Sequence, residues 1–134
     1  DGSSGQFIKT DGLGNLSFAT AGATLSHSDL ADATTTVATS TTSTLNSFDK
    51  TVYRSAKYFI SITDSTNSRF EIVEANVTHD GSDAYVSTFG STTNYTGGLC
   101  VFTADMSGDD VRLRVTNISD ASTVFKFQRI AVDI

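Results

Sequence analysis

The sequence predicts an all-β fold: a jelly-roll-like antiparallel β-sandwich of about eight strands, preceded by an N-terminal hairpin and an extended arm. The strand-forming residues Thr, Val, Ile, Phe and Tyr are plentiful, whereas Glu, Lys, Gln and Leu, which favour helices, are scarce. Short runs of strand-forming residues follow one another between turns rich in Gly, Asp, Asn and Ser. With 134 residues, 38% of them hydrophobic, the chain is large enough to build one core.

We divide the chain into residues 1–46, a hairpin and a Ser/Thr-rich extended arm, and residues 47–134, the body of the sandwich. The hairpin is predicted over "GQFIKTDGLGNLSFAT", where the turn at Asp11-Gly12 separates Phe7 from Leu16 and Phe18. Two strands alone are only marginally stable in water, so this hairpin needs a surface on which to pack.

The segment between the hairpin and the body contains two signals. "SHSDLADA" predicts one helical turn, with Ser26 or Ser28 as the N-cap and Asp29 and Asp32 in the first turn. "TTTVATSTTSTL" then predicts a long extended strand, which its density of β-branched Thr favours over disorder.

The body contains a series of predicted strands at short spacing. "AKYFISIT" places Tyr58, Ile60 and Ile62 on one face, and "VRLRVTN" is the cleanest alternation. In "FEIVEANVTH" the parity of the apolar residues changes, which predicts either a β-bulge near Ile72 or a strand buried on both faces. The remaining strands are predicted in "AYVSTFG", "LCVFTAD" and "TVFKFQRIAVDI".

The charge and the cysteine content exclude several kinds of protein. A net charge of −6 argues against nonspecific binding to nucleic acid and to anionic membranes. We expect no signal peptide, and the sequence has no apolar run long enough to span a bilayer. Cys100 is the only cysteine, so no intrachain disulfide forms, and its apolar context "GGLCVFTA" predicts a buried, unreactive thiol. Because the chain opens on Asp1 rather than Met, we expect it to be a piece of a longer protein.

Several segments together resemble a known kind of domain: "FIKTDGLGNLSFAT", "YRSAKYFISITD", "VTHDGSDAYVSTFG", "FTADMSGDDVRLRVTN" and "TVFKFQRIAV". They resemble a β-rich domain in virion structural proteins of tailed marine bacteriophages, especially cyanophages, from fibres and appendages. The resemblance covers Gly5 to Thr20 and Phe48 to Val132 and carries no catalytic motif. It implies a location on the virion surface, other virion proteins as partners, and a homotrimer that would bury the hairpin.

A metal site has one weak candidate, the turn "ADMSGDD" with Asp105, Asp109 and Asp110. Carboxylates suit Ca²⁺, but the spacing does not match an EF-hand loop. We therefore predict a solvated hairpin turn, no bound metal and no cofactor.

Catalytic groups are also weakly supported. His79 lies beside Asp80 and Asp83, but at an Asp-Gly turn the Asp80 side chain is expected to bond its own backbone. The two Glu residues, Glu71 and Glu74, are three apart on a predicted strand and so are expected on opposite faces, which argues against a pair flanking one sugar bond. We predict that the chain is not an enzyme.

Sugar contacts are predicted from aromatic residues near loops, namely Tyr53, Tyr85 and Tyr95. Tyr95 in "STTNYTGG", with the neighbouring Asn94, is the best placed of these, because binding residues concentrate on loops held by a rigid scaffold. The predicted ligand-binding residues are Tyr95, Asn94 and Tyr53.

The leading hypothesis is a non-enzymatic structural module of a phage virion, in a tail fibre or appendage, that contacts a glycan of the host surface. Two alternatives remain open: a capsid decoration protein that binds the head lattice through residues 1–46, and a lectin-like carbohydrate-binding module. A polysaccharide depolymerase fits the sequence least well.

Overall fold

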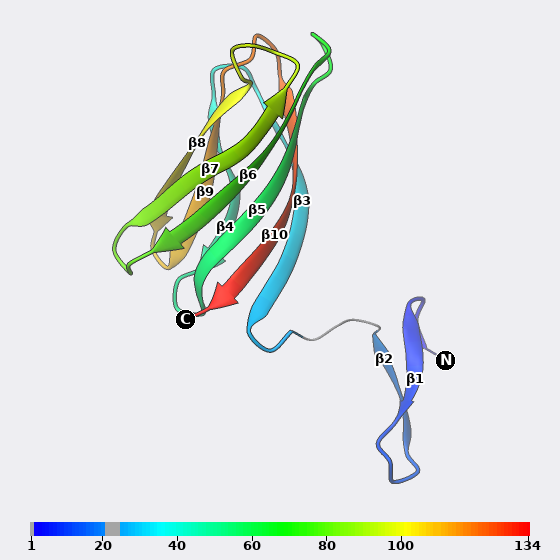
Figure 1. Cartoon of the computed structure of the whole chain (residues 1–134). Helices are drawn as coiled ribbons and strands as arrows, with labels where there is room; N and C mark the ends of the chain where they lie inside the picture. Colours follow the sequence, from blue (N-terminus) through cyan, green and yellow to red (C-terminus); the bar gives the residue numbers. More distant parts are fainter. Residues whose placement is uncertain (1, 21–24) are drawn as a thin grey trace.

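The computed structural model describes residues 2–20 and 25–134, and in these residues it is all-β (Figure 1). No helix occurs in this part of the chain, and so none that is long and apolar enough to cross a bilayer. The ten strands are β1 (Gln6–Thr10), β2 (Leu16–Thr20), β3 (Ser28–Val37), β4 (Thr42–Asp49), β5 (Tyr53–Asp64), β6 (Arg69–His79), β7 (Ala84–Thr93), β8 (Cys100–Ser107), β9 (Asp110–Asn117) and β10 (Thr123–Asp133).

The strands form three antiparallel sheets. A five-stranded sheet in the order β3-β10-β5-β6-β7 packs on a three-stranded sheet in the order β4-β9-β8, and β1 and β2 pair with each other. The hairpin lies apart from the sandwich (Figure 1). These pairings confirm the predicted antiparallel β-sandwich.

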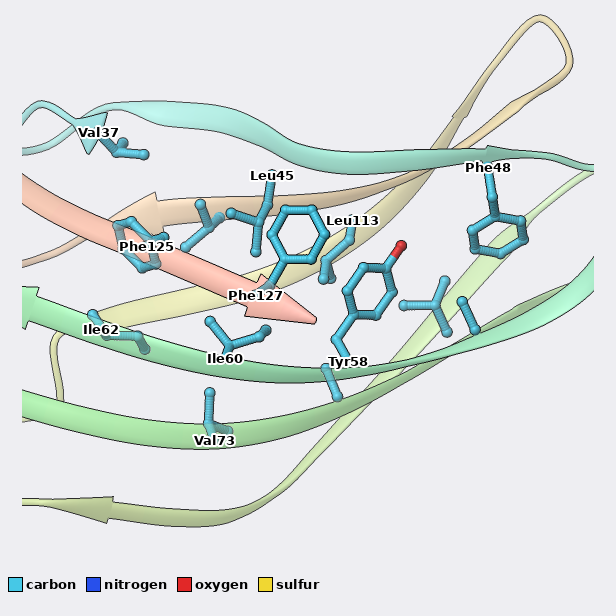
Figure 2. Packing of buried hydrophobic residues seen from close by; sticks show 14 of the residues in the cluster. Val37, Leu45, Phe48, Tyr58, Ile60, Ile62, Val73, Leu113, Phe125 and Phe127 are labelled. Carbon is cyan, nitrogen blue, oxygen red and sulfur yellow. The ribbon is translucent and has the colours of Figure 1, made fainter. Parts of the chain in front are cut away.

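The core lies between the two larger sheets and follows the period of two along each strand. Tyr58, Ile60 and Ile62 of β5 are fully or almost fully buried, as predicted. Figure 2 shows them with Phe125 and Phe127 of β10, facing apolar side chains of the three-stranded sheet. The buried apolar side chains of β9 are Val111, Leu113 and Val115.

The predicted helical turn is wrong, because residues 28–37 form strand β3. All ten residues from Ser28 to Val37 pair with β10, and this long ladder outweighs the local capping signal of Ser and Asp. The predicted long extended strand is also interrupted. A turn closed by the bond from Thr41 N to Ala38 O (3.3 Å) separates β3 from β4, and these strands join different sheets.

Besides a shift between Val132 and Asp133 at the end of β10, two register shifts adjust the described strands. One lies between Ile72 and Glu74 in the pairing of β6 with β7, near the predicted position, but the extra residue belongs to β7, between Phe89 and Thr92. Because β6 pairs with β5 without a shift, Phe70 and Ile72 lie on the outer face, and the predicted bulge does not explain their parity. The other lies between Thr44 and Asn46 of β4. There Leu45 is buried while the Asn46 side chain also reaches the interior, where its Oδ1 accepts hydrogen bonds.

A buried amide closes one end of the sandwich. Asn117, at the end of β9, is fully buried, and its Nδ2 donates to the carbonyl oxygens of Val37 and Ala121, each at 2.9 Å. Its Oδ1 accepts from Ser119 N at 2.8 Å and from the Thr123 hydroxyl at 3.3 Å. Both donors and both lone pairs of the amide are therefore used.

A buried carboxylate reinforces the same end. Asp64, at the end of β5, accepts hydrogen bonds from Asn67 N (3.1 Å), from Asn67 Nδ2 (2.8 Å) and from the Ser119 hydroxyl. The bonds from Asn67 and Ser119 hold the pKa of Asp64 below its ordinary value. The carboxylate thus ties the β5–β6 turn to the loop that follows β9.

A buried guanidinium bridges the two sheets at the other end. Arg129 of β10 is 6% exposed and donates from Nη1 to Asn46 Oδ1 and to Ser47 O, each at 3.0 Å. Its Nη2 pairs with the carboxylate of Asp29. The Tyr58 hydroxyl donates to the same Asn46 oxygen at 3.0 Å, and burial raises the pKa of Tyr58 to about 12. Asp29 therefore serves as a partner for a buried cation rather than as a helix cap.

Replacing Asn117→Ala is expected to lower the free energy of unfolding by about 3 kcal/mol, because two buried carbonyl oxygens lose their donor. Urea denaturation at a fixed protein concentration measures the change. The matched control is Asn76→Ala, an exposed strand position, which is expected to change stability by less than about 0.5 kcal/mol. Equal effects of the two variants would contradict the role of the buried amide.

The unfolding free energy is expected to fall as the pH drops below about 4, the ordinary range of Asp. A carboxyl whose folded-state pKa is lowered, such as Asp64, stabilises the fold above its unfolded pKa and loses that contribution as the pH falls through the folded value. In Asp64→Asn this part of the acid dependence is absent, so urea titrations between about pH 2 and 6 should give a shallower slope than in the wild type. An unchanged slope would contradict the assignment.

Candidate functional site

The loop at 94–99 contains two of the predicted sugar contacts. The amide of Asn94 holds the loop to β6, accepting from Phe70 N at 2.8 Å and donating to Ser68 O at 3.0 Å. The ring of Tyr95 packs partly on the core, and the Arg69 guanidinium lies over its face, 3.8 Å from the ring centroid. The structure thus brings Asn94 and Tyr95 together in a loop fixed by side-chain bonds.

Tyr53, the third predicted sugar contact, lies far from this loop. It begins β5, whereas Asn94 N bonds to Phe70 O, at the level where β5 ends. Twelve residues of extended strand separate the two levels by roughly 35 Å, so one small ligand cannot touch Tyr53 and Tyr95 together.

His79 is a buried structural residue. Its Nε2 donates to the carbonyl oxygen of Tyr53 at 2.8 Å. The carboxylate of Asp80 accepts from Ser82 N at 2.9 Å and from Asp83 N at 2.8 Å, which confirms the predicted backbone bonding. These bonds lower the pKa of Asp80 to about 2. Neither group is arranged as a general base.

The carboxylate of Asp105 already accepts hydrogen bonds from arginine side chains. It lies on β8, where its two carboxylate oxygens accept from Arg112 Nε and Nη2, each at 2.7 Å, and a further bond comes from Arg114 Nη1 at 3.3 Å. The hydrogen bond and charge of Arg112, with the charge of Arg114, lower the pKa of Asp105. A cation at this carboxylate would have to displace both guanidinium groups.

Asp109 and Asp110 lie beyond it, at the turn between β8 and β9. Asp109 pairs with Lys50 at 3.4 Å, and Asp110 pairs with Ser107 and Asp49 across the sheet. Within residues 2–20 and 25–134, no group of three or more His, Cys, Asp or Glu side chains is placed to hold a metal ion.

The two Glu residues lie on opposite faces of β6, as predicted. Glu71 pairs with Ile62, whose side chain is buried, whereas Glu74 pairs with Phe59 on the outer face. Glu71 Oε2 accepts from Leu99 N at 2.8 Å, so this carboxylate holds the loop before β8. The pair therefore does not flank one glycosidic bond.

Cys100 begins β8 and packs partly against the core. Burial, and to a lesser degree the nearby Glu71 carboxylate, raise its pKa well above the ordinary value. A thiol with a raised pKa is a poor nucleophile at neutral pH.

The N-terminal hairpin is exposed at every residue from Gln6 to Phe18. The Asp11 carboxylate accepts from Leu13 N at 2.8 Å and from Asn15 Nδ2 at 2.7 Å, which closes the predicted Asp-Gly turn. Ile8, Leu16 and Phe18 lie on one face, and each is about half exposed or more. In the described residues, β1 and β2 hydrogen-bond in a sheet only with each other. An apolar face on an isolated two-stranded sheet marks a surface for association.

The outer face of the five-stranded sheet carries a second apolar surface, of which the sequence analysis named only Tyr85, as a candidate sugar contact. Its exposed side chains are Leu30, Phe59, Tyr85, Phe89, Ile130 and Val132. Aromatic and branched residues in strands normally indicate core, so only the pairing register reveals that these point outward. Shallow grooves cross this face.

Comparisons with known proteins find structures of similar fold. No protein-family model matches the chain, and no curated protein matches it. Among solved structures, the tailspike protein of Acinetobacter baumannii phage AM24 is similar, with a TM-score of 0.51 and 11% identity over 80% of this chain and 26% of that one. About four fifths of the chain therefore has the fold of part of a phage tailspike.

Two further tailspikes are less similar. The tailspike of Acinetobacter phage vB_ApiP_P1 has a TM-score of 0.42 and 17% identity, over 86% of this chain and 23% of that one. The tailspike gp49 of Acinetobacter baumannii bacteriophage Fri1, a capsular polysaccharide depolymerase, has a TM-score of 0.39 and 16% identity, over 79% of this chain and 18% of that one. The chain spans about a quarter of these proteins, or less.

Adding Ca²⁺ is expected to leave the melting temperature unchanged, because the carboxylate of Asp105 already accepts from two arginines. Differential scanning fluorimetry with millimolar CaCl₂ and with EDTA measures this. A Ca²⁺-dependent rise that is lost in Asp109→Asn would contradict the expectation and restore the metal site.

Proposed function

We propose that this chain is a non-enzymatic structural module of a bacteriophage virion, in a tail fibre or tail appendage, where it forms homotrimers and meets a glycan of the host surface. The fold it shares with part of the AM24 tailspike supports a tail location. The likeness of its sequence segments to structural proteins of marine phages, especially cyanophages, supports the same setting.

The observation that carries the proposal is the exposed apolar face of the hairpin. Burying a side chain such as Ile8, Leu16 or Phe18 stabilises by about 1.5–3 kcal/mol. Within one chain this stabilisation is not realised, since the sandwich lies apart from the hairpin. Three hairpins related by a threefold axis would each bury this face against the other copies. Such a cyclic arrangement forms a closed assembly.

A structural role also agrees with how the acidic side chains are used. The carboxylates of Asp64, Asp80, Asp105 and Glu71 all accept hydrogen bonds from neighbouring protein groups. Each of these bonds fixes a turn, a loop or a strand pair. They stabilise the scaffold, and we assign them no part in bond cleavage.

Light scattering at micromolar concentration is expected to give about 43 kDa, three times the 14.2 kDa of one chain. Ile8→Asp combined with Phe18→Asp is expected to give the monomer mass, because two charges then occupy the apolar face. Ser17→Asp lies on β2 but on the opposite face of the hairpin, and it should keep the trimer. A monomeric wild type would contradict the fibre proposal.

Averaged electron micrographs of the particle carrying a labelled copy of the chain are expected to place the label on the tail. The exposed hairpin is equally suited to bind another virion protein, which is how a capsid decoration protein would attach. A label on the head would therefore favour the decoration role over the tail role.

A further inference from the structure

A groove of about 550 Å³ crosses the outer face of the five-stranded sheet from β10 to β7. One row of its lining consists of Ile130, Lys57, Asn76 and Ser87, which are successive partners on β10, β5, β6 and β7. The next row ends in Tyr85. Four neighbouring strands make each row about 14 Å wide, so the groove has the length of a short oligosaccharide rather than of a single small ion.

The Tyr85 ring is held in place before any ligand arrives. Its hydroxyl donates to Asp80 Oδ2 at 2.9 Å, and Asp80 is itself fixed by the backbone N–H groups of Ser82 and Asp83. The side chain is nevertheless 52% exposed. An exposed ring of fixed orientation is a stacking platform that loses little conformational entropy on binding.

Unused polar groups lie next to this platform. The hydrogen bonds found among the described residues use none of the side chains of Ser55, Asn76 and Ser87, all of which line the groove. Lys57 is neutralised by Glu74 at 3.1 Å and lies 5.3 Å from the centroid of the Phe89 ring. The groove thus offers hydroxyl and amide groups, apolar C–H surface from Ile130, and no unpaired charge.

We propose that this groove binds an uncharged oligosaccharide, with a pyranose ring stacked on Tyr85 and its hydroxyls hydrogen-bonded to Asn76 and Ser87. Sugars present one apolar C–H face and a rim of donors and acceptors, which match the ring and the free side chains. An anionic ligand fits less well, because Lys57 is paired and the chain carries a net charge of −6. This inference rests on the glycan contact of the proposed function and moves it from the Tyr95 loop to the sheet face.

A second copy of the chain is a poorer occupant of the groove. The dry centre of a protein interface would leave Ser55, Asn76 and Ser87 without partners, and each unsatisfied buried polar group costs about 1–3 kcal/mol. The hairpin face, which is apolar, does not have this cost.

The test uses the full chain on an array of purified bacterial surface polysaccharides, followed by calorimetry with the strongest neutral ligand. Tyr85→Ala and Asn76→Ala are each expected to weaken binding about tenfold, which corresponds to about 1.4 kcal/mol. Tyr95→Ala, an aromatic residue of the 94–99 loop, is the matched control and should bind like the wild type. Melting temperatures show that each variant is folded, and light scattering shows whether its mass changes.

The outcomes separate the groove from the wider proposal. Binding that survives Tyr85→Ala but is lost in Tyr95→Ala would overturn the groove and keep the glycan contact. A wild type that binds only acidic polysaccharides would overturn the uncharged ligand. A wild type that binds no polysaccharide would overturn both the groove and the glycan contact. The trimer proposal would still be tested separately, by the mass from light scattering. A change in the oligomeric mass of Tyr85→Ala would indicate that the groove is a protein interface, and it would overturn the sugar site.

Discussion

The side-chain amide of Asn117 lies where the chain passes between the two sheets, and the arrangement of the strands around it depends on this contact. One of its donors reaches Val37, the last residue of β3 in the five-stranded sheet, although Asn117 itself ends β9 in the three-stranded sheet. Its other bonds shape the loop that leads into β10 through Ala121, Ser119 and Thr123. An apolar side chain at this position would fill the space but leave the carbonyl oxygens of Val37 and Ala121 without this donor. The amide therefore sets the crossover as well as the packing.

Different kinds of side chain satisfy the buried polar groups at the two ends of the sandwich. At the Asn117 end, neutral groups and one carboxylate satisfy one another within turns. At the other end, the guanidinium of Arg129 connects β10 to Asn46 of β4 and to Asp29 of β3. Between these ends the core is apolar, and the Tyr58 hydroxyl reaches across it to Asn46. Polar groups thus fix the register of the sheets at both ends, while burial of apolar surface supplies most of the stability.

The fold class followed from local pattern, because alternation and turn residues are local properties. The faces of β5 and β9 were predictable for this reason. The strand at Ser28–Val37 was not, because its ladder with β10 joins residues about 90 positions apart and overrides a local capping signal. The groove beside Tyr85 could not be predicted from the sequence either. Its shape depends on the register of four strands, and a strand aromatic has no local mark that tells an outward ring from a core one.

The pairing of β3 with β10 also determines how the module carries mechanical load. Ser28, where the chain enters the sandwich, lies beside Val132, close to where β10 ends. A pull between these two points would separate the strands one rung at a time, like a zipper. A pull between Ser28 and a ligand beside Tyr85 also runs across the strands, because both residues lie in one row of cross-strand partners that passes through Val132, Ser55 and Thr78. The load then falls first on the pair of Ser28 with Val132, at one end of the β3–β10 ladder, so both pulls open this ladder from the same end.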